Sequence, residues 1–256
     1  MKILAIGDVV GSIGCLFLRQ KLPKLKKLRG IDFVIANGEN SADGNGITPN
    51  SAEFLFSSGV DVITTGNHSF RRKEIYPYYD EALYILRPAN FPKKTTPGKG
   101  ILIYDMGRIQ ICVINLMGCV FLENLKDPYE TIDELLEENR TKITILDFHA
   151  EATAEKLAMG YYLDGKISAM FGTHTHVQTA DECIFENGMG YITDVGMTGP
   201  IKSVLGVKPE LAIKKQKEKL PVRFETASGN CKMDCILFEI DEKSGKTVNI
   251  ERIEIK

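Results

Sequence analysis

The sequence predicts an α/β protein in which a β-sheet lies between layers of helices. Short apolar runs rich in β-branched residues recur along the chain and are bounded by Gly, Asn or Asp, which is typical of strands buried on both faces. Helix-like stretches separate several of these runs, as in other α/β proteins. The chain has 256 residues, of which 43% are hydrophobic. We therefore expect a single domain, residues 1–256, with a sizeable core.

Seven runs are expected to form strands, namely residues 2–6, 32–36, 60–64, 101–104, 109–115, 142–148 and 167–171. Three amphipathic stretches predict helices at residues 12–28, 131–139 and 152–163. Pro23 is expected to break or kink the first helix.

The last quarter of the chain has a different pattern. Strand-like runs at residues 183–185 and 191–195 flank Asn187-Gly188, and runs at 235–240 and 247–255 flank Ser244-Gly245, so each pair predicts a hairpin. Between the hairpins, residues 196–230 are rich in Gly and Pro and are expected to be irregular apart from a lysine-rich helix at 209–219.

Composition excludes several classes of protein. The 32 Lys and Arg against 34 Asp and Glu give a formal net charge of −2, so no overall basic field is available to bind nucleic acid. No apolar stretch approaches the length of a membrane-spanning helix, and the N-terminal apolar run is too short for a signal peptide. The six cysteines include no CxxC pair and are expected to be reduced thiols of a cytoplasmic protein.

Polar side chains follow five of the predicted strands, at the edge where ligands bind in α/β sheets. They are Asp8, Glu39-Asn40, Asn67-His68, His149 and the pair His174 and His176. All four histidines of the chain are among them. Each motif alone has an ordinary alternative: Asp8 suits a helix cap, Asn67 suits a turn, and His149 suits a core position. If His174 and His176 lie in an extended segment, both imidazoles point to the same side.

The residue types indicate metal chemistry. Oxygen and nitrogen donors without thiolates favour Fe, Mn or Zn. The set is too large for one tetrahedral ion and suffices for two divalent ions sharing a carboxylate, which is the usual apparatus of phosphoester hydrolysis.

Several of these motifs, in this order, resemble those of the calcineurin-like metallophosphoesterases. The matching residues are Gly7-Asp8, Gly66-Asn67-His68, His149 and Gly172-Thr173-His174-Thr175-His176. The segments NGEN around Glu39, GNHSF around His68, and DVGMTGP…SVLG from Asp194 to Gly206 are similar, more narrowly, to the YmdB-type family. The resemblance implies a four-layer α/β/β/α sandwich with mixed sheets and a two-metal centre.

The resemblance also implies a role for each residue. One metal would be held by Asp8, Glu39, Asn40 and His176, and the other by Glu39, Asn67, His149 and His174. Glu39 would bridge the two metals, and His68 would contact the phosphate and protonate the leaving oxygen. Val10 stands where the wider superfamily has a histidine ligand, and Ser69 stands where it has an acid, which leaves open which group tunes His68.

The activity implied is a metal-dependent phosphodiesterase that hydrolyses cyclic nucleotides, in particular 2′,3′-cyclic nucleotides to 3′-nucleotides, by attack of a metal-bridging hydroxide. Two divalent ions are expected, with Fe or Mn favoured over Zn. The alternatives are a nuclease or phosphomonoesterase on the same site, or a regulatory nucleotide-binding protein with little turnover.

Residues 196–230 are interpreted as a wall of the substrate entrance, a subunit contact in a homo-oligomer, or a plain surface loop. The basic run at residues 21–29 is interpreted as a solvated helix face. The alternative is that it forms an RNA-binding patch or binds an RNA-processing partner.

Overall fold

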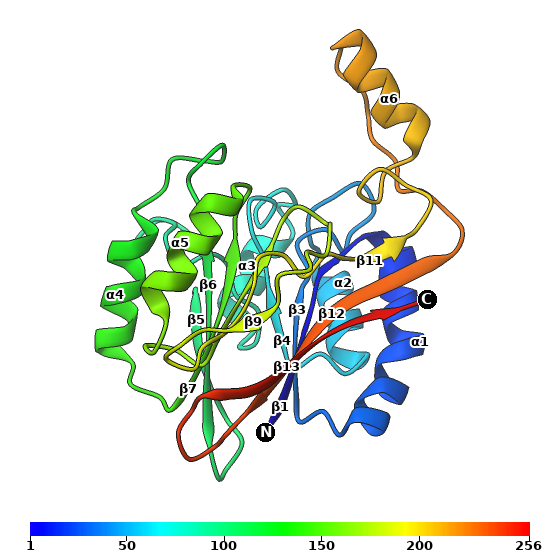
Figure 1. Cartoon of the computed structure of the whole chain (residues 1–256). Coiled ribbons are helices and arrows are strands. Elements are labelled where there is room, and N and C mark those ends of the chain that lie inside the picture. The colour runs from blue at the N-terminus through cyan, green and yellow to red at the C-terminus, as the bar shows by residue number, and fades with distance from the viewer.

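The computed structural model, which describes residues 1–256, has two β-sheets packed face to face with helices on both outer sides (Figure 1). The first sheet contains β1 (Lys2–Ile6), β2 (Asp8–Val9), β3 (Phe33–Asn37), β4 (Val62–Thr64), β11 (Met197–Pro200), β12 (Cys231–Ile240) and β13 (Thr247–Ile255). Its order is β2-β11-β12-β1-β3-β4, with β13 paired to β12. Strands β1, β3 and β4 run parallel, whereas β12 is antiparallel to its neighbours β1, β11 and β13.

The second sheet contains β5 (Ile101–Asp105), β6 (Gln110–Met117), β7 (Ile143–His149), β8 (Ala169–Thr173), β9 (Cys183–Ile184) and β10 (Gly190–Ile192). Its order is β5-β6-β7-β8-β10-β9, and only the edge strands β5 and β9 are antiparallel to their neighbours. Both sheets are therefore mixed, as predicted.

Six helices complete the fold: α1 (Gly11–Arg29), α2 (Pro49–Ser57), α3 (Ile75–Glu81), α4 (Pro128–Glu138), α5 (Thr153–Leu163) and α6 (Pro209–Glu218). Helices α1, α2 and α3 pack on the outer face of the first sheet, and α4 and α5 pack on the outer face of the second. Helix α6 stands away from the sandwich (Figure 1). No helix is both long and apolar enough to span a bilayer.

Three separate hydrophobic clusters lie between these four layers. Along β1, Leu4 and Ile6 face the cluster beneath α1 and α2, whereas Ile3 and Ala5 face the cluster between the sheets. A third cluster joins the second sheet to α4 and α5. Because a strand alternates its side chains between two faces, an apolar run such as that of β1 serves two cores at once. The structure thus confirms the predicted four-layer α/β/β/α sandwich.

All seven predicted strands and both hairpins are present, with boundaries shifted by a few residues. Helices α2 and α3 were not predicted; α2 is short and begins at a capping box between Thr48 and Ser51, with Pro49 as its first residue. Pro23 lies inside α1 and does not end it. Residues 196–230 are less irregular than expected, because β11 pairs with both β2 and β12 at the start of the segment.

We predict that Phe238→Ala, in the cluster between the sheets, lowers the free energy of unfolding by about 3–5 kcal/mol, because Phe238 is fully buried and its removal leaves a cavity. Phe121→Ala is the control, since this side chain is 86% exposed. Urea unfolding of both variants measures the difference. Equal midpoints would show that the two sheets do not share a packed core.

Candidate metal centre

The predicted site residues converge at the carboxyl ends of strands from both sheets. Asp8 lies in β2, immediately beyond β1, and His149 is the last residue of β7. The remaining residues follow β3, β4 and β8 within four residues: Glu39, Asn40, Asn67, His68, His174 and His176. The structure therefore brings all eight together, from five positions far apart in the sequence.

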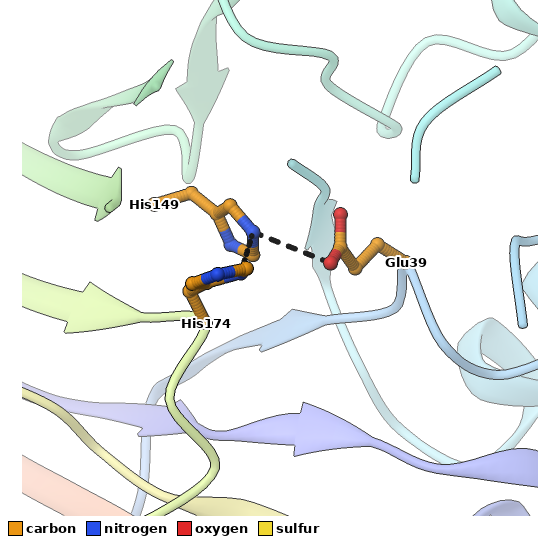
Figure 2. A group of neighbouring side chains, drawn as sticks. All are labelled: Glu39, His149 and His174. Atoms are coloured by element: carbon orange, nitrogen blue, oxygen red, sulfur yellow. Dashed lines mark hydrogen bonds and ion pairs between the residues drawn. The ribbon is translucent and has the colours of Figure 1, made fainter. Parts of the chain in front are cut away.

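Glu39, His149 and His174 form a group whose ligand atoms lie within 4.8 Å of one another (Figure 2). The Nε2 atom of His149 is 3.2 Å from Glu39 Oε1 and 3.1 Å from His174 Nδ1. The same nitrogen is also 2.9 Å from Asn67 Oδ1. A single imidazole N–H cannot satisfy three such neighbours. The convergence of oxygen and nitrogen atoms on one point instead fits a bound cation.

A second group lies around Asp8. Its carboxylate is fully buried, and Oδ1 has no hydrogen-bond partner, although His176 Nε2 lies 3.5 Å away. The amide nitrogen of Asn40 is 3.3 Å from His176 Nε2 and 3.4 Å from Glu39 Oε1. A buried carboxylate oxygen without a partner is costly unless a cation satisfies it. Glu39 lies between the two groups, which is the position that its predicted bridging role requires.

Burial and neighbouring charges shift the pKa values of Asp8 and His149. Burial opposes ionisation of Asp8, but His176 and His149 together hold its pKa well below the usual range. Burial also disfavours a charged His149, yet Glu39 beside it raises the pKa of His149 to about 9. A metal ligand must be an unprotonated imidazole, so a metal bound here would displace a proton from His149.

His68 differs from the other histidines in its position. Its side chain is 23% exposed and lines the pocket above the site, and burial of the rest of the ring lowers its pKa. Its Nδ1 lies 2.9 Å from Asn40 Oδ1, and its backbone N–H donates to Glu39 Oε2. Asn40 thus orients His68, whereas Ser69 is buried and bonds to Thr65. For Asn40 also to ligate a metal, its amide oxygen would use its second lone pair, because the first accepts from His68 Nδ1.

The expectation of an extended segment at His174 and His176 is wrong. Both residues have positive φ, 104° and 62° respectively, so strand alternation does not set their direction. His174 turns toward His149, and His176 turns toward Asp8. The loop is held by Asp194, which accepts hydrogen bonds from the backbone N–H of Thr175 and from the buried ammonium of Lys156.

A buried network beneath the site was missed. Thr173 Oγ1 lies 2.9 Å from His149 Nδ1 and donates to Asp147 Oδ1 at 2.7 Å. Asp147 also accepts from Thr64 and Asn37, and burial raises its pKa to about 7. Second-layer bonds of this kind fix the ring of a ligand histidine. The signal was available, because Asp147 is two residues before His149 and therefore on the same face of the strand.

The site opens into a pocket of about 170 Å³. One wall carries Asn40, His68 and His176. The opposite wall comes from residues 205–207 and 224–226, which belong to the segment before β12. His176 Nδ1 lies 3.0 Å from the carbonyl oxygen of Leu205, which joins the two walls.

The two mixed sheets packed face to face between outer helices form a metallophosphoesterase-like fold. The fold is shared with the NAD nucleotidase of Haemophilus influenzae, which is 14% identical with a TM-score of 0.60 over 99% of this chain and 55% of that one. The YmdB-like protein family matches residues 4–253, and the chain belongs to this family.

Two relatives are much more similar. A 2′,3′-cyclic-nucleotide 2′-phosphodiesterase of Bacillus subtilis (strain 168) is 49% identical over 100% of this chain and 97% of its own length. The crystal structure of a phosphatase from Mycoplasma pneumoniae has a TM-score of 0.95 at 34% identity, covering 100% of this chain and 93% of that one. The predicted family and the prediction of a hydrolase are confirmed.

We predict that Thr173→Val weakens metal binding about 10- to 100-fold, because it removes the hydroxyl that holds His149 Nδ1 while keeping the side-chain volume. The measurement is Mn²⁺ affinity by competition with a chelating dye. Thr141→Val is the control, since its hydroxyl contacts Thr144 at the far end of β7. Equal affinities in the two variants would contradict a positioning role for Thr173.

Proposed function

We propose that the protein is a metal-dependent phosphodiesterase that opens 2′,3′-cyclic nucleotides to 3′-nucleotides. The observation that carries the proposal is the pair of ligand groups sharing Glu39 beneath a pocket that His68 lines. The B. subtilis relative supports the substrate, because it is named for this reaction and matches the whole chain at 49% identity.

The donor set fits two divalent ions. Asp8, Glu39, Asn40 and His176 would hold one ion, and Glu39, Asn67, His149 and His174 would hold the other. Fe or Mn suits these oxygen and nitrogen donors, with Zn as the alternative. Bound there, the ions supply Lewis acidity toward the phosphate and the attacking water. No lysine or arginine pairs with Asp8 or Glu39, so the positive charge that meets a phosphate must come from the ions.

His68 is proposed to supply the proton for the leaving group. When His68 is protonated, its Nδ1–H donates to Asn40 Oδ1 and its Nε2–H is left to carry a proton into the pocket. Hydrolysis adds water across the P–O2′ bond, so the phosphate stays on the 3′ oxygen and the 2′ oxygen leaves. His68 Nε2 would donate its proton to that oxygen. Burial lowers the pKa of His68, which makes its imidazolium a stronger acid but a less populated one.

A cytoplasmic location is proposed as well. The six cysteines are unpaired and four of them are buried, as expected in a reducing compartment. A homo-oligomer and an RNA-processing partner stay predictions.

A substrate screen tests the function. Protein loaded with Mn²⁺ or Fe²⁺ is assayed with 2′,3′-cyclic AMP, 3′,5′-cyclic AMP, a nitrophenyl phosphomonoester and short RNA. We expect 2′,3′-cyclic AMP to be hydrolysed fastest, with 3′-AMP as the product. Preference for the monoester or for internal RNA cleavage would indicate a phosphomonoesterase or a nuclease, and no hydrolysis of any compound would indicate a binding protein.

We predict that His68→Ala lowers kcat on 2′,3′-cyclic AMP at least about 100-fold and keeps most of the bound metal, because the general acid is lost while the ligand groups stay intact. His149→Ala is the comparison, since it removes a ligand and should lose metal and activity together. Elemental analysis and steady-state kinetics give the two quantities. Parallel loss of metal and activity in His68→Ala would make His68 a ligand.

A further inference from the structure

A second hollow adjoins the catalytic pocket. Its volume is about 410 Å³, and it shares Gly44, Asn45 and Phe224 with the pocket above the ligand groups. Three arginines line it: Arg71, Arg72 and Arg223. We refer to this hollow as the arginine pocket. Its one acidic residue is Asp43, whose carboxylate accepts a hydrogen bond from the backbone N–H of Ser12.

The three guanidinium groups are not equivalent. Arg72 is engaged, because its Nε donates to the carbonyl oxygen of Asn45 and its other nitrogen donates to that of Asp43. It therefore fixes the turn that separates the two pockets. The side chains of Arg71 and Arg223 are exposed and have no hydrogen bond or ion pair. Two guanidinium groups without partners beside one hollow offer the charge and the N–H donors that an anion can bind.

Arg71 and Arg223 lie close to residues of the proposed catalytic pocket. Arg71 follows His68 by three residues, and its backbone N–H donates to the His68 carbonyl oxygen at 3.1 Å. Arg223 precedes Phe224, which forms part of the wall common to both pockets. An anion in the arginine pocket would therefore lie beside a substrate whose cyclic phosphate occupies the ligand groups.

We propose that the arginine pocket binds a second phosphate of the substrate, on the 5′ side of the ribose whose 2′,3′-cyclic phosphate is hydrolysed. This inference rests on the proposed function. In a nucleotide the 5′ oxygen and the 2′,3′ edge lie at opposite ends of one ribose, which suits two adjoining pockets. Guanidinium groups match the oxygens of a phosphate in geometry and charge. Phe224 adds an aromatic surface at the junction on which a base can stack.

The proposal changes the class of substrate expected. The enzyme would prefer a cyclic phosphate that carries a further phosphate over a simple cyclic nucleoside phosphate. The second phosphate can be a 5′-monophosphate on a mononucleotide or the linkage to the preceding nucleotide in a short RNA. The near-zero net charge of the chain does not oppose this preference, because a local pair of arginines is sufficient for one phosphate.

The test compares three substrates on the full, metal-loaded chain: 2′,3′-cyclic AMP, its 5′-phosphorylated form, and the dinucleotide ApA with a terminal 2′,3′-cyclic phosphate. We expect kcat/KM to be about 10-fold higher or more for at least one of the two substrates with a second phosphate. A preference for the 5′-phosphorylated mononucleotide alone assigns the pocket to a terminal phosphate, and a preference for the dinucleotide assigns it to an internucleotide linkage. Equal kcat/KM for all three would overturn the inference and leave the proposed function standing. Hydrolysis of none would overturn both.

Substitutions of the arginines test whether they cause the preference for substrates with a second phosphate. Arg223→Ala, and Arg71→Ala together with Arg223→Ala, should bring the ratio of kcat/KM between phosphorylated and unphosphorylated substrates toward one, through a higher KM for the phosphorylated form. Arg223→Lys should keep part of the ratio. Lys73→Ala is the matched control, because Lys73 is an exposed cation next in sequence to Arg72 and lies outside the pocket. A ratio that survives the double substitution would overturn the assignment even if the substrate preference exists.

Discussion

The structure depends on the burial of two carboxylates, Asp8 and Glu39, at the edge where the two sheets meet. Ionised groups without solvent are costly unless opposite charge lies beside them. Here the ion-pair partners are the imidazoles of His68, His149 and His176, and neither carboxylate has a lysine or arginine. Both sheets must therefore deliver their strand ends to one place. Gly66 shows how tightly they meet, because a Cβ at this position would lie 2.1 Å from the ring of His149.

Each layer therefore contributes different residues to the site. The first sheet supplies the carboxylates and His68, and the second supplies His149 and the loop with His174 and His176. The buried Lys156–Asp194 pair and the Asp147 network hold the second set from below. The segment between β11 and β12 then closes the pocket from the other side. Metal ions would supply the positive charge at the reacting phosphate, while arginines supply it only at the neighbouring pocket.

The parts that could be predicted from the sequence are local ones. Each proposed ligand lies at the end of an apolar strand or within three residues beyond it, so the strand pattern alone predicts Asp8, Glu39 and His149 at one edge. The direction of His174 and His176 could not be predicted in this way, since it depends on positive φ values held by tertiary bonds to Asp194 and Asp8. Helices α2 and α3 have too few residues for a clear periodicity. The arginine pocket joins residues near 71 and 223, and no local pattern shows that proximity.

The most direct test of the account is anomalous diffraction from crystals of the protein loaded with Mn²⁺ or Fe²⁺. The account predicts two peaks about 3.5–4 Å apart, on either side of the Glu39 carboxylate. One peak should lie beside Asp8 and His176, and the other beside His149 and His174. A single peak, or peaks that do not contact Glu39, would contradict the shared-carboxylate centre on which the proposed chemistry depends.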